Sequence, residues 1–586
     1  MSALISLLPY LRPYRSVIVW GALIAVFNNA VGALAPWIVK LAIDSLSQTP
    51  SSAILAKYAL LLVAVVAVAC GLRFLLRKIL IGMSRHVELD LRNSVFAHLQ
   101  RLSASFYNRN RAGDLMARLT SDLERVRYVL GPGIMYPLDT VTVGVFSLAM
   151  MLLISPKLTL IVLISAPVIS VSVFFLGRIT YRLHGRIQDQ FSELSAHAQE
   201  NLAGVRVVRA FAQEEREIGR FGELNEEYIR RNIAMVRVQA LFMPVMALFF
   251  EIGTAVILFF GGWGIIHAQL TLGDFVGFVG YLGMLAWPMI AIGWVANLYQ
   301  RGAASMRRLN EILETEPQIV SPLSSHRPAE VRGEIVFEGV SFQYDGSANT
   351  LHDVNLVIPS GRTVAIVGRT GSGKSTLVSL IPRVFDPTEG RVLIDGVPTT
   401  SWDLKALRSA IGMVPQDALL FSDTLAANLR FSSDAVKQED FERATVTSQI
   451  VTDVAEFRDG YATMVGERGL TLSGGQKGRA TLARALLHDP AILILDDALA
   501  AVDTHTEERI LQPLREFTRG RTSLIISHRV STVRHADEII VLDEGRIIER
   551  GTHDQLVSAG GYYAELERLQ RIEKELEEIN GQPSQT

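Results

Sequence analysis

The sequence predicts a multidomain chain, in which a transmembrane α-helical domain of six helices precedes an α/β domain built around a phosphate-binding loop. The first domain is predicted by composition and pattern. Of the 586 residues, 49% are apolar and only 20% are charged, and long apolar stretches recur through the first half. The second domain is predicted by a β-branched run, TVAIV at 363–367, that leads directly into the glycine-rich segment GRTGSGKST at 368–376.

Six apolar stretches are long enough to cross a bilayer, whose core requires about 20 mostly apolar residues per helix. Only Pro156–Lys157 joins the third and fourth stretches, and only His267–Leu272 joins the fifth and sixth. The polar stretch Asp44–Ser52 joins the first two. The predicted spans are 17–43, 54–80, 133–154, 156–178, 238–266 and 272–298.

Arginine and lysine set the expected orientation. Residues 77–132 and 178–237 each carry ten of them, whereas the three short connections carry almost none. Because positive charge stays on the cytoplasmic side, we expect a multi-pass protein of the cell (inner or plasma) membrane. Both termini and the α/β domain would then be cytoplasmic. The six spans disfavour a soluble-type ATPase such as a repair protein.

Charge and cysteine content set limits on partners. The net charge of −2 argues neither for nor against nucleic acid, and we expect no nucleic-acid partner. Cys70 is the single cysteine, so an intrachain disulfide is excluded. It lies in an apolar run. Arg12 and Arg15 precede the first span without a small-residue cleavage site, which indicates an uncleaved membrane anchor.

Polar residues within the spans allow two interpretations. A charge in lipid is costly, so Glu251 and Asp139 are candidate substrate contacts. The alternative for each is a structural hydrogen bond between helices or a position near the membrane surface. For Asn28 and Asn29 in the first span, hydrogen bonding between helices is the favoured interpretation.

The long loops between spans carry apolar and charged residues at helical spacing, so we expect the membrane helices to continue into the cytoplasm.

A stretch rich in proline and serine, EPQIVSPLSSHRPAEVRG, separates the two halves. The expected divisions are a transmembrane domain at 1–315, a linker at 316–332, a nucleotide-binding domain at 333–565 and a C-terminal helix and tail at 566–586. In the last segment Leu566, Leu569, Leu576 and Ile579 recur at near-heptad spacing. This helix would either zip against the tail of a partner chain or pack on its own domain.

The glycine-rich segment has the context that phosphate binding requires. Glycines allow tight turns that direct backbone N–H groups at phosphate, and a helix beginning near Lys374 adds its positive dipole end. Lys374 is expected to reach the β- and γ-phosphates of a nucleotide, and Ser375 is expected to ligate Mg²⁺. The candidate phosphate-binding residues are Gly368, Arg369, Thr370, Gly371, Ser372, Gly373, Lys374, Ser375 and Thr376.

A second motif, LSGGQ at 472–476, follows in the same domain. With the P-loop it resembles the Walker A and signature motifs of ATP-binding cassette (ABC) proteins, and the resemblance covers residues from about 8 to 565. A membrane domain fused ahead of one cassette is similar to ABC exporters of the multidrug and lipid type. The resemblance implies ATP and Mg²⁺ as ligands, the lipid bilayer as the setting, and a hydrophobic or amphipathic substrate of unknown identity.

The resemblance also assigns roles to residues outside the P-loop. An aromatic residue that stacks on adenine corresponds to Tyr344, and the glutamine that touches Mg²⁺ and connects to the membrane domain corresponds to Gln416. Asp496 ends the run AILILD and would hold Mg²⁺ through water. His528, in IISHRV, corresponds to the histidine that senses the γ-phosphate.

In this family the signature closes over ATP held by the P-loop of another cassette. Ser473, Gly474, Gly475 and Gln476 are therefore expected to bind the ATP of a partner chain. Ser105–Asp114 and Gly204–Glu215 resemble the coupling helices that dock on cassettes, although ordinary solvated turns would also fit. Thr463–Gly469 resembles the exporter segment that contacts these helices.

The sequence departs from the family at Asp497, where the residue that polarises the attacking water is normally glutamate. Aspartate is one methylene shorter, so its carboxylate falls short by about 1.5 Å. A displacement near 1 Å costs on the order of a hundredfold in rate. The segment ALAAVD at 498–503 also stands where TSALD is usual. We therefore expect Asp497 to occupy the general-base position of an impaired site.

An impaired site beside an intact signature predicts a heterodimer with a homologous ABC half-transporter that carries the catalytic glutamate. Three alternatives remain open: a homodimeric exporter with slow hydrolysis, an importer built on the exporter fold, and an ATP-gated channel or regulator.

Overall fold

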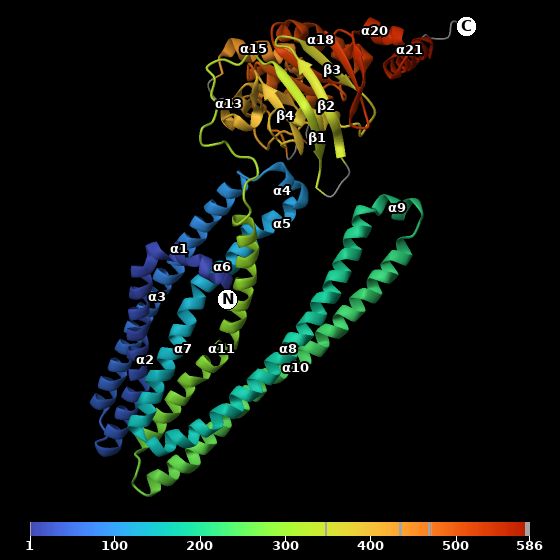
Figure 1. Ribbon diagram of the computed structural model, residues 1–586. Coiled ribbons are helices and arrows are strands. Elements are labelled where there is room, and N and C mark those ends of the chain that lie inside the picture. Colours follow the sequence, from blue (N-terminus) through green and yellow to red (C-terminus); the bar gives the residue numbers. More distant parts are fainter. Residues whose placement is uncertain (1, 346–348, 433–435, 467–468, 470–471, 581–586) are drawn as a thin grey trace. The chain divides into compact units, whose positions relative to one another are not determined.

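The computed structural model describes residues 2–345, 349–432, 436–466, 469 and 472–580 (Figure 1). The chain divides into two compact units. The helical unit comprises Met1–Gln100 and Ala112–Thr315, and the α/β unit comprises Arg101–Arg111 and Glu316–Thr586. The units and the predicted domains differ at Arg101–Arg111, because this short segment contacts residues of the α/β unit.

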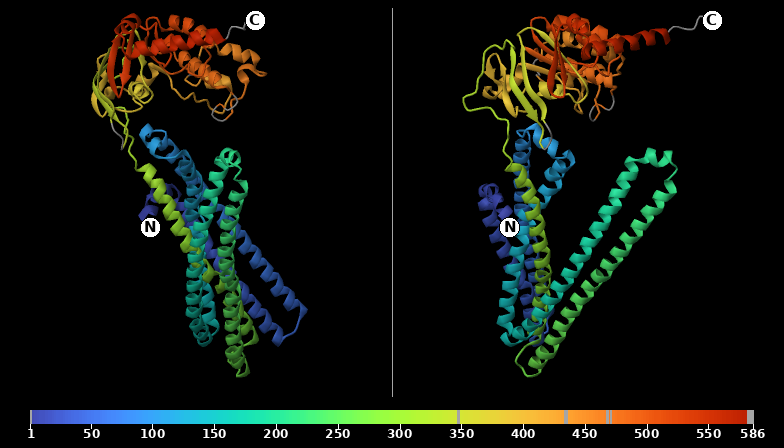
Figure 2. Two further views of the ribbon diagram at one scale, coloured as in Figure 1. Left: turned by 90° about the vertical axis from the view of Figure 1, so that its right-hand side faces the viewer. Right: turned by 45° about the vertical axis from the view of Figure 1, so that its right-hand side comes forward.

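Long helices dominate the helical unit. Figure 2 shows α8 and α10 side by side as a hairpin with the short helix α9 at its tip. The helices α2, α3, α7 and α11 pack on one another. The elements are η1 (Ser2–Leu7), α1 (Leu8–Leu11), η2 (Arg12–Tyr14), α2 (Arg15–Gln48), α3 (Ser52–Leu99), α5 (Ala112–Ala117), η3 (Arg118–Asp122), α6 (Leu123–Leu130), α7 (Pro132–Ile154), α8 (Pro156–Ala203), α9 (Val205–Ala210), α10 (Glu214–Ile266) and α11 (Leu272–Leu313).

Several of these helices are longer than a bilayer is thick. The 48-residue helix α8 extends to Ala203, well beyond residue 178 at which its apolar stretch ends. At 1.5 Å per residue it measures about 70 Å, against about 30 Å of hydrocarbon core. Because the 53-residue helix α10 is similar, the expected continuation of the membrane helices beyond the bilayer agrees with the structure.

Among the described residues, three helical segments are long and apolar enough to cross a membrane: Ala3–Gln48, Ser52–Leu99 and Ala112–Ile154. Two shorter apolar helices are Glu251–Ile266 and Leu272–Leu285. The predicted spans at 156–178, 238–266 and 272–298 include side chains outside the described set. The number six therefore stays a prediction.

Polar side chains connect helices inside the bundle. The amide of Asn29 donates to Asp139 Oδ1 at 3.0 Å and to Thr142 Oγ1 at 2.6 Å, which links α2 to α7. Asn28 in turn donates to Asn29 Oδ1. The hydroxyl of Tyr281 on α11 donates to the carbonyl of Ala33 at 2.7 Å. Asn29 thus bonds between helices as predicted, whereas the Asn28 hydrogen bond stays within α2. Asp139 takes part in a structural hydrogen bond, and Glu251 is exposed.

Two sheets form the centre of the α/β unit. The larger has six strands in the order β10 (Arg546–Gly551), β9 (Glu538–Asp543), β3 (Thr363–Val367), β8 (Thr522–Ile526), β7 (Ile492–Asp496) and β6 (Ile411–Val414). All its pairings are parallel except that of the edge strand β10. The smaller, antiparallel sheet has the order β2 (Asn349–Ile358), β1 (Ile335–Gln343), β4 (Glu389–Ile394) and β5 (Val397–Pro398).

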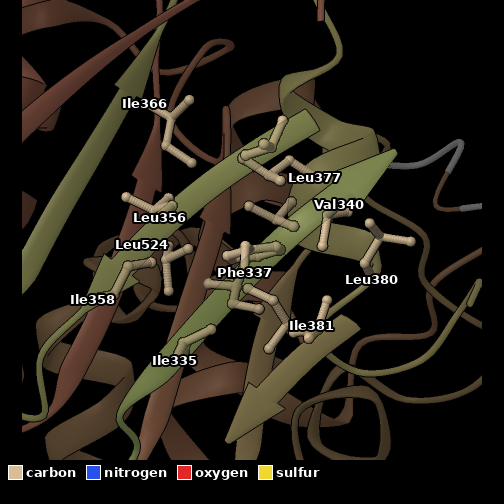
Figure 3. Close-up of a cluster of buried hydrophobic side chains, with 14 of the residues drawn as sticks. Ile335, Phe337, Val340, Leu356, Ile358, Ile366, Leu377, Leu380, Ile381 and Leu524 are labelled. Atoms are coloured by element: carbon tan, nitrogen blue, oxygen red, sulfur yellow. The ribbon is translucent and has the colours of Figure 1, made fainter. Parts of the chain in front are cut away.

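The central strands of the larger sheet are buried on both faces, whereas the edge strand β10 has no buried residue. Every residue of β7 and β8 is buried, which explains why ILILD and TSLII show no alternation of apolar and polar residues. Figure 3 shows Phe337 of β1, Leu356 of β2 and Leu524 of β8 in one apolar cluster that joins the two sheets. This packing fixes the strand ends at which the candidate site lies.

Short helices surround the sheets. They are α4 (Ala104–Arg109), α12 (Lys374–Ser379), η4 (Thr399–Ser401), α13 (Leu404–Ser409), α14 (Leu425–Leu429), α15 (Gln438–Thr447), α16 (Ile450–Glu456), η5 (Gly460–Ala462), α17 (Gly474–Leu487), α18 (Thr504–Thr518), α19 (Val530–Val533), α20 (His553–Ala559) and α21 (Tyr562–Asn580). The C-terminal helix α21 begins at Tyr562, before the predicted residue 566, and packs on this unit through Tyr563 and Leu566. The side chains of Leu576 and Ile579 lie outside the described set, as do residues 581–586.

We predict that Asn29→Ala lowers the stability of the helical unit, because it removes both donors from Asp139 and Thr142 inside the bundle. Hydrogen bonds of this kind between membrane helices contribute on the order of 1 kcal/mol. Thermal unfolding in detergent would measure the loss. Phe27→Leu, at a position on the same helix that is 59% exposed, is the control and should leave the midpoint unchanged. An Asn29→Ala protein that melts with the wild type would contradict the structural role.

Candidate nucleotide site

The P-loop connects β3 to α12 at the middle of the larger sheet. Three of its glycines have positive φ angles, 152° at Gly368, 83° at Gly371 and 98° at Gly373. A Cβ atom at Gly368 would collide with the carbonyl oxygen of Leu542 on the neighbouring strand β9. The turn therefore requires glycine for close backbone approach as well as for its dihedral angle.

A pocket of about 290 Å³ opens beside this loop. Its lining combines side chains from six segments of the unit, and most of the predicted site residues are among them. The lining residues are Tyr344, Thr350, Thr370, Gly371, Gly373, Lys374, Ser375, Thr376, Gln416, Asp496, Asp497, Ile526 and His528. The predicted residues Gly368, Arg369 and Ser372 belong to the loop but not to this lining, and none of Ser473–Gln476 lines it.

The Lys374 side chain is buried under the P-loop. Its ammonium donates to the carbonyl oxygens of Gly368 at 2.8 Å and Arg369 at 2.7 Å. Burial lowers the pKa of Lys374, while the carboxylates of Asp497 and Asp496 act in the opposite direction. The ammonium thus lies where an anion bound by the loop would meet it.

Ser375 and Asp496 face each other across the pocket. The Ser375 hydroxyl donates to Asp496 Oδ1 at 3.0 Å, although the two residues are 121 positions apart. Burial raises the pKa of Asp496, and the nearby Asp497 carboxylate raises it further, whereas the Ser375 hydrogen bond and the charges of Lys374 and His528 lower it. Two acidic groups at one strand end, held together in a buried site, favour a bound cation.

A divalent cation fits this donor set only with help from the nucleotide. Ser375, Gln416 and Asp496 supply a hydroxyl, an amide and a carboxylate oxygen, which are the ligand types that Mg²⁺ prefers. Within the described part of the chain, no cluster of three or more His, Cys, Asp or Glu side chains is present that would hold a metal alone. Mg²⁺ in such a site would complete its coordination with phosphate oxygens and water.

Asp497 follows directly at the end of β7. Its backbone has φ of 49°, a left-handed conformation that aspartate tolerates better than most residues. Its N–H donates to the carbonyl of Ile526 on β8 at 2.9 Å, and its carbonyl accepts from Ala500 at 3.1 Å. Because the backbone is fixed on both sides, the reach of the carboxylate is set by the length of the side chain.

Tyr344 is held edge-on by two other aromatic rings. Its ring lies 4.9 Å from that of Phe342 and 5.4 Å from that of Phe385, measured between centroids. Its hydroxyl lies 3.0 Å from Thr376 Oγ1 of the P-loop helix. The predicted adenine-binding residue therefore borders the pocket and is attached to the same helix as the phosphate-binding residues.

The short helix α4 lies against this corner of the α/β unit. Arg109 forms an ion pair of 2.7 Å with Asp345, the residue after Tyr344. Ser105 donates to Gln318 Oε1 at 2.6 Å. Tyr344 also borders a second pocket, of about 480 Å³, between α4 and the strands. The first segment predicted to be a coupling helix thus adjoins the residue predicted to bind adenine.

The signature residues lie apart from this pocket, and Ser473 and Gly474 among them are exposed. The Ser473 hydroxyl accepts from the N–H of Gln476, and the Gln476 side chain accepts from the N–H of Ser473 in a capping box at the start of α17. Arg479 binds Asp453 with two hydrogen bonds of 2.8 and 2.7 Å, which attaches α17 to α16. In the preceding segment Thr463–Gly469, Glu467 and Arg468 lie outside the described residues.

His528 borders the pocket from the loop after β8, and its neighbours were not identified from sequence. Glu507 on α18 is buried and binds Arg529, Ser531 and Thr532. Gln570 on α21 binds the backbone of His528 and Val530. These contacts join residues 22 to 42 positions apart, so no local motif could have indicated them.

The comparisons with known proteins agree with this geometry. Residues 18–289 match the ABC transporter transmembrane region, and residues 351–500 match the ABC transporter family. The chain is 39% identical over 497 residues to YheI, a probable multidrug resistance ABC transporter ATP-binding/permease protein of Bacillus subtilis, covering 84% of each chain. It is 36% identical over 571 residues to the ATP-dependent lipid A-core flippase of Nitrosococcus oceani, covering 96% of this chain and 94% of the flippase.

A solved structure has the same overall fold. It is a bacterial Atm1-family ABC exporter with ATP bound, which superposes with a TM-score of 0.79 at 29% identity. The match covers 95% of this chain and 98% of the exporter. The chain therefore belongs to the ABC transporter family, with a transmembrane region and an ATP-binding cassette fused as in exporter half-transporters.

We predict that Lys374→Ala weakens ATP binding by at least about tenfold, because one charge-assisted hydrogen bond contributes on the order of 1.5–3 kcal/mol. Titration of the purified full-length chain with a fluorescent ATP analogue would measure the dissociation constant. Arg362→Ala is the control, since this arginine pairs with Asp537 on the same unit but does not border the pocket. Equal affinity in the Lys374→Ala and wild-type proteins would contradict the assignment.

Proposed function

We propose that this protein is one half of a heterodimeric ABC exporter, that its own nucleotide site binds Mg-ATP but hydrolyses it slowly, and that its signature completes the catalytic site of a homologous partner. The observation that carries the proposal is Asp497. It is the acidic residue at the end of β7 that borders the nucleotide pocket beside Asp496, at the position where the family has a longer glutamate.

The proposed setting is the cell membrane, with both termini and the cassette in the cytoplasm. The distribution of arginine and lysine between short and long loops supports this orientation. One relative is named for multidrug resistance and another for flipping of the lipid A core. We propose a hydrophobic or amphipathic substrate for this protein as well, carried outward across the bilayer.

In the proposed nucleotide complex, each pocket residue has a defined task. Lys374 exchanges its contacts with the loop carbonyls for β- and γ-phosphate oxygens, at little cost because it is already desolvated. Tyr344 stacks on adenine. Ser375, Gln416 and Asp496 would hold Mg²⁺, which supplies positive charge between the phosphate oxygens. His528 would contact the γ-phosphate from the far side of the pocket.

Slow hydrolysis follows from the reach of Asp497. Its peptide group is fixed by hydrogen bonds to Ile526 and Ala500, so the backbone does not move forward freely to compensate for a missing methylene. A general base must lie within hydrogen-bond distance of the proton that it removes. A carboxylate about 1.5 Å short favours a water poorly aligned for attack, and hence a long-lived ATP complex.

Exposed surfaces support an assembly of two chains. Ser473 and Gly474 are exposed and lie outside the lining of the chain's own nucleotide pocket. On α9 and its flank, Val207 is 61% exposed and Phe211 is 73% exposed. Large exposed apolar side chains are typical of protein interfaces. We propose that both surfaces are covered by the partner half-transporter.

The proposed cycle is alternating access. Two ATP molecules bind between the cassettes and favour the closed dimer, because ATP has higher affinity for the closed state than for the open one. Closure reaches the membrane helices through the coupling segments, of which α4 is one. Hydrolysis at the partner's site then allows the cassettes to separate, while the site with Asp497 retains its nucleotide longer.

Purification of the native chain from its own membrane tests the assembly. A second, homologous chain with glutamate at the position of Asp497 is the expected result. Recovery of this chain alone would support a homodimer, and brisk ATP hydrolysis abolished by Asp497→Ala in that preparation would overturn the heterodimer. ATP-dependent current without accumulation in sealed vesicles would instead indicate a channel, and inward accumulation would indicate an importer.

For the purified chain by itself, we predict that Asp497→Glu raises the ATP turnover rate by about ten- to a hundredfold, because it restores the carboxylate to catalytic reach. Phosphate release from the full-length protein in nanodiscs measures the rate. Asp503→Glu is the matched control, since Asp503 caps α18 through Thr506 and lies outside the pocket lining. A rate unchanged by Asp497→Glu would show that another feature limits hydrolysis.

A further inference from the structure

The loop that carries His528 is held by the C-terminal helix α21. The Gln570 side-chain amide donates to the carbonyl of His528 at 2.6 Å, and its oxygen accepts from the N–H of Val530 at 2.8 Å. One side chain thus pairs with two peptide groups of the loop, as a neighbouring β-strand would. Gln570 is 42 positions away from His528 and does not border the nucleotide pocket.

The same loop is held on another side by Glu507 of α18. This carboxylate is only 1% exposed, and it accepts hydrogen bonds from Arg529, Ser531 and Thr532. Arg529 also donates to the carbonyls of Val502 and Ala500. Side chains after His528 are therefore fixed by Glu507, whereas Gln570 fixes the two peptide groups on either side of Arg529, the first of which contains the His528 carbonyl.

Glu507 and Gln570, the two residues that hold the loop, differ in how deeply they are buried. Glu507 is part of the buried interior, so its removal would leave several unsatisfied groups. Gln570 is only half-buried, and the start of α21 is anchored independently. Tyr563 is fully buried, with its hydroxyl 2.8 Å from His553 Nδ1, and the Glu549 carboxylate accepts from the N–H groups of Tyr562 and Tyr563. Loss of the Gln570 amide would therefore release the His528 carbonyl and the Val530 N–H, while Glu507 still holds the following side chains and α21 stays in place.

We propose that Gln570 is a positioning residue for the nucleotide site, which holds the backbone of His528 so that its imidazole meets the γ-phosphate. The inference rests on the proposed role of His528. It assigns to α21 a task beyond packing: the helix sets the geometry with which the site distinguishes ATP from ADP. Because only ATP carries the γ-phosphate, a displaced His528 weakens ATP binding and leaves ADP binding unchanged.

The test is a comparison of Mg-ATP and Mg-ADP affinities in the full-length chain, with fluorescent analogues of both nucleotides. Gln570→Met keeps the length of the side chain and removes both hydrogen bonds. We expect about a three- to tenfold loss of ATP affinity, which is the effect of losing one well-placed hydrogen bond. ADP affinity should stay within about twofold of the wild type. Arg571→Ala, at the adjacent exposed position, is the control and should change neither value.

His528→Ala separates failure of the inference from failure of the proposed function. A selective loss of ATP affinity in His528→Ala, with Gln570→Met unchanged, would overturn the role of Gln570 alone. An equal loss of ATP and ADP affinity in Gln570→Met, with a lower melting temperature, would show that α21 only supports the fold and would also overturn it. No selective loss in His528→Ala would refute γ-phosphate sensing by His528, and the inference would fall with it.

Discussion

The nucleotide site depends on one constraint, the parallel pairing of four adjacent strands in the cassette. The strands β3, β8, β7 and β6 all point in the same direction, so their carboxyl ends meet at one edge of the sheet. The P-loop follows β3, and His528 follows β8. Asp496 ends β7 and Asp497 comes directly after it, while Gln416 follows β6. Parallel sheets of this kind place their ligands at the carboxyl ends of the strands. The apolar cluster between the two sheets supports these strands and thereby the residues that line the pocket.

The buried charged groups at this edge of the sheet determine which ligands it can bind. Lys374 and Asp496 are both nearly inaccessible to water, and burial shifts the pKa of each toward its neutral form. A buried charged group is stabilised by an opposite charge close to it. The site contains the Lys374 ammonium, the carboxylates of Asp496 and Asp497, and the Ser375 hydroxyl. Among the described residues, no cluster of three or more His, Cys, Asp or Glu side chains could hold a metal by itself. A phosphate chain accompanied by a metal ion would meet both the cation and the carboxylates of this site.

Contacts at the margins of the pocket connect it to the rest of the α/β unit. Arg109 of α4 pairs with the residue after Tyr344, and Gln570 of α21 binds the backbone of His528. The Arg109–Asp345 pair is more than half exposed on both sides, so its contribution to folding stability is small. Such a contact can break and form again without unfolding the domain.

The sequence by itself determined the apolar spans, the P-loop with its flanking strand, and the identity of the motif residues, because each is written in a short local pattern. It also indicated the substitution at Asp497, since a motif shows which of its members is altered. Only the tertiary structure decided the remainder. The Ser375–Asp496 hydrogen bond joins residues 121 positions apart, Asn29 meets Asp139 across two helices, and Gln570 reaches the loop of His528 from the last helix. Such contacts arise where folded segments meet, and the periodicity of either segment alone carries no information about its partner.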